Sequence, residues 1–143
     1  MRYPAIVTKE GRFTLAAFPD CPGCATQADP GESILDQATD ALTGWLEAHL
    51  VTGEVPPRPR TRPKGKVLWV EVPATLAVKV SLRWARTDAG LTQRELAKRA
   101  GVTQQAIAKL EHPDANPGVE TLEKVARALG VRLSIDFLPM HAA

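Results

Sequence analysis

The chain has 143 residues, which is enough for one domain or two small ones. It carries 18 basic and 16 acidic side chains, and it shows neither a secretory signal nor an apolar run long enough to span a bilayer. With two cysteines and no export signal, we expect a cytoplasmic protein without membrane contact.

The charges are distributed unevenly along the chain. Residues 1–55 hold three basic and eight acidic side chains, a net charge of −5. Residues 56–80 hold six basic and one acidic side chain, a net charge of +5, and residues 81–143 hold nine and seven, a net charge of +2. An acidic first third is unsuited to DNA binding and suits a basic protein partner.

The first third of the chain predicts a small sheet covered by one helix. Residues 3–8 and 12–18 are predicted strands joined by a tight Glu-Gly hairpin, and residues 25–28 are predicted to form a short third strand. Residues 33–50 carry apolar side chains at helical spacing, which predicts a helix packed on one face of the sheet.

The middle of the chain links this sheet to the second half. Residues 56–66 are rich in proline and arginine, and we favour a solvated loop over a basic arm that touches the DNA backbone. Residues 67–72 predict a strand beside the first strand. Pro73 begins a predicted linking helix over residues 73–89.

Residues 91–111 have the pattern of a helix-turn-helix. Thr92 and Glu95 can form a capping box, and Gly101 suits the left-handed end of that first helix. Thr103 can cap the second helix. The apolar residues between these positions are spaced to share one core: Leu96, Ala97, Ala100, Val102, Ile107 and Leu110. Because all these positions are filled at once, we favour DNA binding over an ordinary helical hairpin.

The outer face of the second helix predicts contacts with DNA bases. Gln104 and Gln105 can pair with adenine, and Lys109 can donate to guanine or to phosphate. Gln93, at the start of the preceding helix, is placed for a phosphate contact. Together with Thr103 at the start of the second helix, these residues form the predicted DNA-binding set.

The end of the chain predicts an oligomer. Residues 131–137 alternate apolar and polar side chains, which predicts a strand. A lone strand leaves its edges unpaired, so we expect it to pair with a second copy in a homodimer or a higher even oligomer. Residues 112–118 carry no Lys or Arg, so strong DNA binding would also require two copies.

Residues 82–135 resemble the phage repressor/Cro type of helix-turn-helix, which is often called XRE-like. The motifs are Gly-Leu-Thr-Gln at 90–93, Thr-Gln-Gln at 103–105 and Leu-Glu at 110–111. The resemblance implies the DNA contacts described above. It also implies a structural ion pair between Arg86 and Glu111, which we do not count among the base contacts.

Residues 2–72 resemble the HicB antitoxin family. The resemblance rests on Tyr-Pro-Ala near the start, Phe-Pro-Asp-Cys-Pro-Gly-Cys-Ala-Thr-Gln at 18–27, a helix from Glu32 with Ala41 and Trp45, and a proline-rich stretch after Gly53. It implies a partial, catalytically inert ribonuclease-H-like fold and a role in a type II toxin–antitoxin pair. Such antitoxins bind a small basic HicA-type toxin that cleaves mRNA, and they repress their own operon.

We therefore expect an α+β protein of two domains. Domain 1–72 has a small sheet with one covering helix and binds the toxin. Domain 73–143 is an all-helical helix-turn-helix domain with a C-terminal strand, and it binds operator DNA. We expect no catalytic residue, no cofactor and no metal ion. The alternative is an ordinary XRE-type transcriptional regulator whose N-terminal domain senses a ligand.

Two further motifs point to other chemistry. Cys21 and Cys24 form a C-x-x-C, but a zinc site needs more ligands and a redox dithiol normally opens a helix, so neither is expected. A third hypothesis, a metal-dependent nuclease, would use four carboxylates: Asp20, Glu32, Asp36 and Asp40. We favour an acidic surface that faces solvent or a partner, because the two helical aspartates lie off the apolar stripe.

Overall fold

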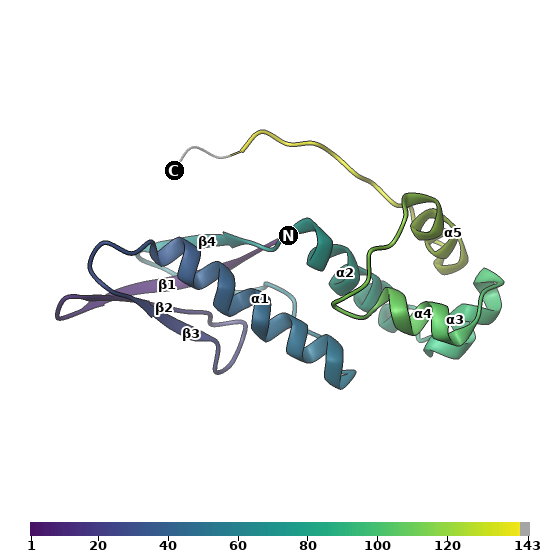
Figure 1. Cartoon of the computed structure of the whole chain (residues 1–143), viewed down its shortest axis with the longest axis horizontal. Coiled ribbons are helices and arrows are strands. Elements are labelled where there is room, and N and C mark those ends of the chain that lie inside the picture. Colours follow the sequence, from purple (N-terminus) through teal and green to yellow (C-terminus); the bar gives the residue numbers. More distant parts are fainter. Residues whose placement is uncertain (141–143) are drawn as a thin grey trace.

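The structure is a computed structural model that describes residues 1–140, so the last three residues of the predicted second domain lie outside the described range. The sheet lies at one end of an elongated molecule and the last three helices lie at the other (Figure 1). The elements are β1 Arg2–Glu10, β2 Phe13–Ala17, β3 Ala25–Ala28, α1 Ile34–Thr52, β4 Val67–Glu71, α2 Ala74–Asp88, α3 Gln93–Ala100, α4 Gln104–Leu110 and α5 Val119–Leu129. The predicted α+β class and the order of these elements are confirmed.

The sheet has the strand order β3-β2-β1-β4, and every neighbouring pair is antiparallel. Between β1 and β2, Gly11 has a φ of 59°, a left-handed conformation that glycine adopts without a Cβ clash. β4 pairs with β1 from Arg2 opposite Glu71 to Ile6 opposite Val67. The start of the chain is therefore held by a strand that follows α1, as the sequence predicts.

α1 lies across one face of the sheet (Figure 1). Its start is capped by Ser33, whose Oγ accepts a hydrogen bond from the N–H of Asp36 at 3.2 Å, and it ends at Gly53 with a φ of 79°. Four side chains spaced four residues apart are buried on its inner side: Ala38, Leu42, Leu46 and Leu50. They pack with buried strand residues that include Tyr3, Ala5, Ala16 and Val70. The outer side of α1 is left for polar residues.

α2 belongs to two hydrophobic cores. Leu76 and Val80 pack with the sheet and α1, whereas Leu82 packs with residues of α3, α4 and α5. The predicted linking helix therefore contributes buried side chains to both cores. This position brings α2 side chains into contact with both halves of the protein.

α3 and α4 form the helix-turn-helix corner. The Oγ1 of Thr92 accepts a hydrogen bond from the N–H of Glu95 at 3.1 Å, and the Glu95 carboxylate accepts one from the N–H of Thr92 at 3.3 Å. This reciprocal pair is the predicted capping box. Gly101 ends α3 with a φ of 68°, and Thr103 caps α4 by accepting from the N–H of Ala106 at 3.1 Å. The local signals in the sequence thus fix where both helices begin.

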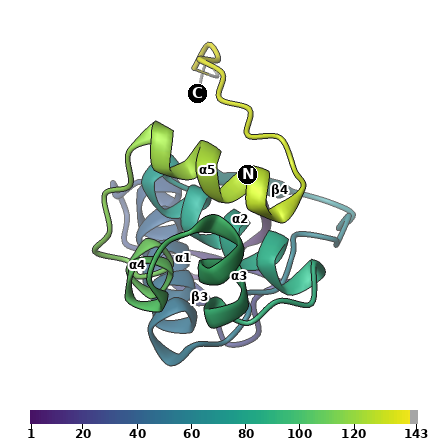
Figure 2. The same ribbon diagram turned by 90° about the vertical axis from the view of Figure 1, so that its right-hand side faces the viewer.

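The prediction of a C-terminal strand over residues 131–137 is wrong for the single chain. Residues 131–140 follow α5 without strand pairing, and the later part of this segment leaves the body of the protein in both views (Figures 1 and 2). A strand exists through hydrogen bonds to a neighbouring strand, and no strand within residues 1–140 lies beside this segment. Its apolar side chains are left exposed: Phe137 by 102%, Leu138 by 81% and Met140 by 96%.

Candidate nucleic-acid interface

The helix α4 presents its polar side chains to solvent. Gln104, Gln105 and Lys109 are exposed, whereas Ile107 and Leu110 on the other side of the helix are buried in the core. α3 and α4 lie at the end of the molecule away from the sheet, and Figure 2 looks onto this end from outside. The three polar side chains therefore project to solvent from a helix whose other side is packed in the core.

The starts of α3 and α4 extend the same surface. Gln93 is the first residue of α3 and is half-buried, and Thr103 is exposed at the cap of α4. The Thr103 hydroxyl accepts its capping hydrogen bond, so its own O–H is left to donate to a phosphate oxygen. The five predicted DNA-binding residues thus come from one α3–α4 corner.

A buried ion cluster lies behind α4. The carboxylate of Glu111, the residue after α4, is 0% exposed and faces two arginines of α2. Arg83 Nε donates to Oε1 at 2.5 Å, while Arg86 Nε donates to Oε2 and Arg86 Nη2 donates to Oε1, both at 2.8 Å. Arg86 Nη1 also donates to the carbonyl of Leu91 at 2.8 Å. The cluster fixes the end of α4 against α2 and takes no part in the exposed surface.

Arg83 is not among the residues predicted from the sequence. Its side chain also donates to backbone carbonyls at the end of α1, so it joins the two halves of the protein. A signal was present, because Lys79 and Arg83 continue the helical spacing of the buried residues Leu76 and Val80 on α2. A basic residue at such a position is expected to have a buried partner.

The proline- and arginine-rich segment between α1 and β4 is docked on the protein, and the prediction of a solvated loop holds only for part of it. Tyr3 Oη donates to the carbonyl of Pro57 at 2.6 Å, and Trp84 Nε1 donates to the carbonyl of Pro56 at 2.6 Å. Burial raises the pKa of Tyr3 far above its ordinary value, so the phenol remains a donor. The segment therefore follows a fixed path across β1 and α2.

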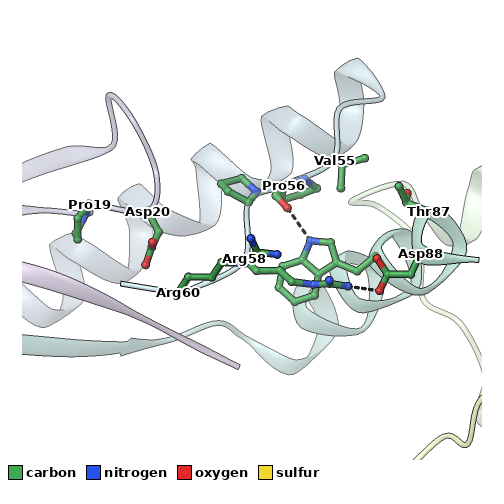
Figure 3. Close-up of a pocket in the computed structure, with 10 residues that line it drawn as sticks. Pro19, Asp20, Val55, Pro56, Arg58, Arg60, Thr87 and Asp88 are labelled. Atoms are coloured by element: carbon green, nitrogen blue, oxygen red, sulfur yellow. Dashed lines mark hydrogen bonds and ion pairs between the residues drawn. The ribbon is translucent and has the colours of Figure 1, made fainter. Parts of the chain in front are cut away.

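This segment forms one wall of an open cleft of about 480 Å³ (Figure 3). Arg58 pairs with Asp88 of α2 at 2.5 Å across the cleft, and Asp20 accepts from the hydroxyl of Thr61 at 2.5 Å. Arg60 lies on the rim and is exposed. The Arg58–Asp88 pair and the Asp20–Thr61 hydrogen bond therefore engage three of the four charged side chains that line the cleft.

The C-x-x-C motif forms a tight turn before β3. Cys21 and Cys24 are free thiols and both are buried, and the N–H of Cys24 donates to the carbonyl of Cys21 at 2.9 Å. Burial raises the pKa of Cys21 to about 12 and that of Cys24 to about 11. The thiolate is the reactive form, so these thiols are arranged for packing and not for nucleophilic chemistry.

The acidic residues considered for a nuclease do not converge. Asp20 is engaged by the loop contact described above, and Glu32 accepts from the N–H of Asp29 at 2.8 Å. Asp36 and Asp40 are exposed on α1. Within residues 1–140, no group of three His, Cys, Asp or Glu side chains is arranged to hold a metal ion. None of the helices in this range has the length and apolar character needed to cross a membrane.

A capped bihelical corner with an exposed, glutamine-bearing second helix defines a helix-turn-helix DNA-binding protein. The family model described as Helix-turn-helix (HTH_3) matches residues 82–135. Antitoxin HicB 1 of Photorhabdus laumondii is 36% identical over 137 residues, which cover 94% of this chain and 86% of the relative. Antitoxin HicB of Escherichia coli K12 is 31% identical over 137 residues, which cover 94% of this chain and 98% of the relative.

The chain belongs to the HicB antitoxin family, because these relatives match it along nearly its whole length. It is an antitoxin that carries a helix-turn-helix. Among solved structures, the HicA3 and HicB3 toxin-antitoxin complex is similar over 51% of this chain and 99% of that chain, with 25% identity and a TM-score of 0.44. The family assignment rests on the sequence relatives.

Replacing Glu111 by Gln should lower the free energy of unfolding by about 3–5 kcal/mol, because two buried guanidinium groups lose their counter-charge. Urea unfolding followed by circular dichroism measures the loss. Asp88→Asn is the matched control, since its ion pair with Arg58 is exposed and should contribute about 1 kcal/mol or less. Equal losses for the two variants would contradict the structural role of the buried carboxylate.

In the native protein at pH 8, a thiol reagent should label Cys21 and Cys24 at least about 100-fold more slowly than in urea, because both thiolate population and access are reduced. Since folding raises both pKa values above 9.0, their contribution to stability is complete below pH 9 and is lost as the pH rises through about 11 for Cys24 and about 12 for Cys21. Quenched time points of the labelling reaction, with and without urea, measure the two labelling rates. Rapid native labelling would show that the turn is open.

Proposed function

We propose that this antitoxin covers a small, basic HicA-type toxin that cleaves mRNA, and that a dimer of it represses its own operon. The observation that carries the proposal is the placement of two different polar surfaces on two separate helices. Acidic side chains lie on α1, and the glutamine-bearing surface lies on α4. The relatives named antitoxin HicB match both halves together, which favours this role over a ligand-sensing transcriptional regulator.

The outer face of α1 supports a basic partner. Asp36 and Asp40 are exposed and Glu47 is half-buried, and all three lie away from the buried stripe of the helix. Among the described residues, none of the three pairs with a basic side chain. Their charge is therefore available to a toxin, and inhibition would be steric and electrostatic without bond chemistry by the antitoxin. We place this action in the cytoplasm.

The DNA-binding half supports contact by two copies. One recognition helix makes few contacts, and residues 112–118 add no Lys or Arg. The C-terminal segment exposes large apolar side chains beyond a mainly apolar groove of about 200 Å³ between α2 and α5. Pairing of two such segments would cover them and supply the missing strand neighbours. The two copies of α4 would then meet operator half-sites about 10 base pairs apart.

Replacing Gln104 and Gln105 together by Ala should weaken operator binding by at least about 30-fold, because two bidentate base contacts are lost. Gel-shift titration at fixed salt measures the change, and a growth assay with the toxin measures neutralisation, which should persist. Gln27→Ala, an exposed glutamine of β3, is the control and should leave operator affinity unchanged. Loss of neutralisation in the double variant would contradict separate surfaces for toxin and DNA.

The toxin partner is tested by expressing the reading frame next to this gene, which we expect to encode a small basic protein. Asp36→Asn with Asp40→Asn should weaken its complex with the antitoxin by about 5-fold or more at low salt and less at high salt, because exposed charges steer association and are screened. Calorimetric titration measures the affinity. Glu120→Gln with Glu123→Gln makes the same charge change on α5 and should have no effect. A salt-independent complex, or none, would argue against this interface.

Phe137→Asp should convert the dimer into a monomer and reduce operator affinity, because a charge would replace an apolar side chain in the proposed pairing. Sedimentation equilibrium measures the mass. Ser134→Asp places the same charge on the alternate side of this segment and should preserve the dimer. The idea fails if the unaltered protein is a monomer at high micromolar concentration or if the Phe137 variant remains a dimer.

A further inference from the structure

The guanidinium group of Arg83 contacts both halves of the protein. Beyond its bond with Glu111 at the end of α4, Nη1 donates to the carbonyl of Glu54 at 2.8 Å and Nη2 donates to the carbonyl of Leu50 at 3.3 Å. Leu50 lies in the last turn of α1, and Glu54 follows the glycine that ends this helix. We propose that Arg83 is a positioning residue through which the orientation of α4, and hence operator affinity, depends on the C-terminal end of α1.

Burial prevents either end of this contact from moving alone. The side chains of Arg83 and Glu111 are 4% and 0% exposed, so neither can exchange its partner for water. The last carbonyls of a helix carry partial negative charge, so the guanidinium is held between a negative group from each half. Displacing α1 would leave the buried Nη1 and Nη2 donors of Arg83 without their carbonyl acceptors. Displacing α4 would separate the buried ion pair between Arg83 and Glu111, which is strongly unfavourable.

The other two cations on this side of α2 show why Arg83 is distinct. Lys79 is 3% exposed and donates to the carbonyl of Pro113, just beyond α4. Arg86 binds Glu111 and the carbonyl of Leu91, both within the helix-turn-helix half. Among the contacts of residues 1–140, Arg83 is the one of these three cations that reaches α1. We call the hydrogen bonds of Arg83 to Glu111, Leu50 and Glu54 the polar joint. The other two cations hold α2 to the region around α4.

The joint has a consequence for an antitoxin that binds both a toxin and an operator, and this step rests on the function proposed above. α1 carries the acidic surface assigned to the toxin. A toxin that shifts or stiffens the last turn of α1 will change operator affinity through Arg83. Because coupling free energies are reciprocal, operator DNA will change toxin affinity by the same factor.

Amide hydrogen exchange in the full-length protein tests the joint without toxin. The N–H groups of Gly53 and Glu54 donate to carbonyls of the last turn of α1 at 3.4 Å and 3.0 Å, so they report on the turn that Arg83 holds. Operator DNA should slow their exchange by at least about 5-fold. The N–H of Gln37, bonded to the carbonyl of Ser33 at 3.1 Å, reports on the far end of α1 and should not change. Unchanged exchange at Gly53 and Glu54 in operator-bound protein would overturn the proposal.

Two arginine variants separate positioning from general stability. Arg83→Met retains the apolar stem and removes the contacts at both ends, whereas Arg86→Met removes one arginine of Glu111 without touching α1. The operator-linked slowing at Gly53 and Glu54 should disappear in Arg83→Met, return in part in Arg83→Lys and persist in Arg86→Met. Equal loss in the two Met variants would show that Arg83 is structural only.

The toxin supplies the second measurement. The ratio of operator affinities for toxin-bound and free antitoxin should differ from one by at least about 5-fold in the unaltered protein. It should approach one in Arg83→Met, and a ratio that stays the same would overturn the proposal. Failure to bind toxin or operator at all would instead contradict the proposed function.

If the protein binds neither toxin nor operator, scanning calorimetry of the free protein tests the polar joint. The unaltered protein and Arg86→Met should unfold in one transition, and Arg83→Met in two, because the two cores lose their shared polar contact. A single transition in Arg83→Met would count against the joint. If Arg83→Met does not fold, Arg83→Gln takes its place in this comparison.

Discussion

The arrangement of the helices depends on the buried carboxylate of Glu111. Removing a carboxylate from water is costly, and Arg83 and Arg86 compensate with three short hydrogen bonds to its two oxygens. α4 has only seven residues and two buried side chains, so its own packing area is small. Its direction is therefore set largely by what holds its end. The exposed glutamines of α4 project from a fixed base because the residue after the helix is locked to α2.

α2 connects the two halves of this antitoxin because it packs in the core of each. Its first turns complete the core under α1, and its later turns complete the core of the helix-turn-helix. The docked segment between α1 and β4 adds contacts to the same helix, through Trp84 and Asp88. The helix proposed to face the toxin and the helix proposed to face DNA both pack on α2, so the two surfaces are separate but share one support. Separate surfaces therefore do not imply independent binding.

Much of the fold follows from local signals that act within a few residues. The hairpin glycine, the stripe of Ala38, Leu42, Leu46 and Leu50, and the Thr92–Glu95 capping box each determine an element without help from the rest of the chain. The outward direction of Gln104 and Gln105 follows from the same helical spacing, because Ile107 and Leu110 occupy the inner side. The family motifs along residues 18–27 and 90–111 then identified the class of protein, which the relatives confirm.

The contacts between distant segments were decided only by the tertiary structure. Periodicity marks Arg83 as a core position but cannot show that Glu111 and the end of α1 meet there, since Glu111 lies 28 residues and Leu50 lies 33 residues from Arg83 in the sequence. Composition predicts a solvated proline- and arginine-rich loop, and the docking of Pro56 and Pro57 depends on donors from Trp84 and Tyr3. The alternation of residues 131–137 signals strand propensity, but a strand requires a neighbour, and the part of the chain that the structure describes supplies none at this place. Sequence determines what each segment can form, and the fold determines which segments find a partner.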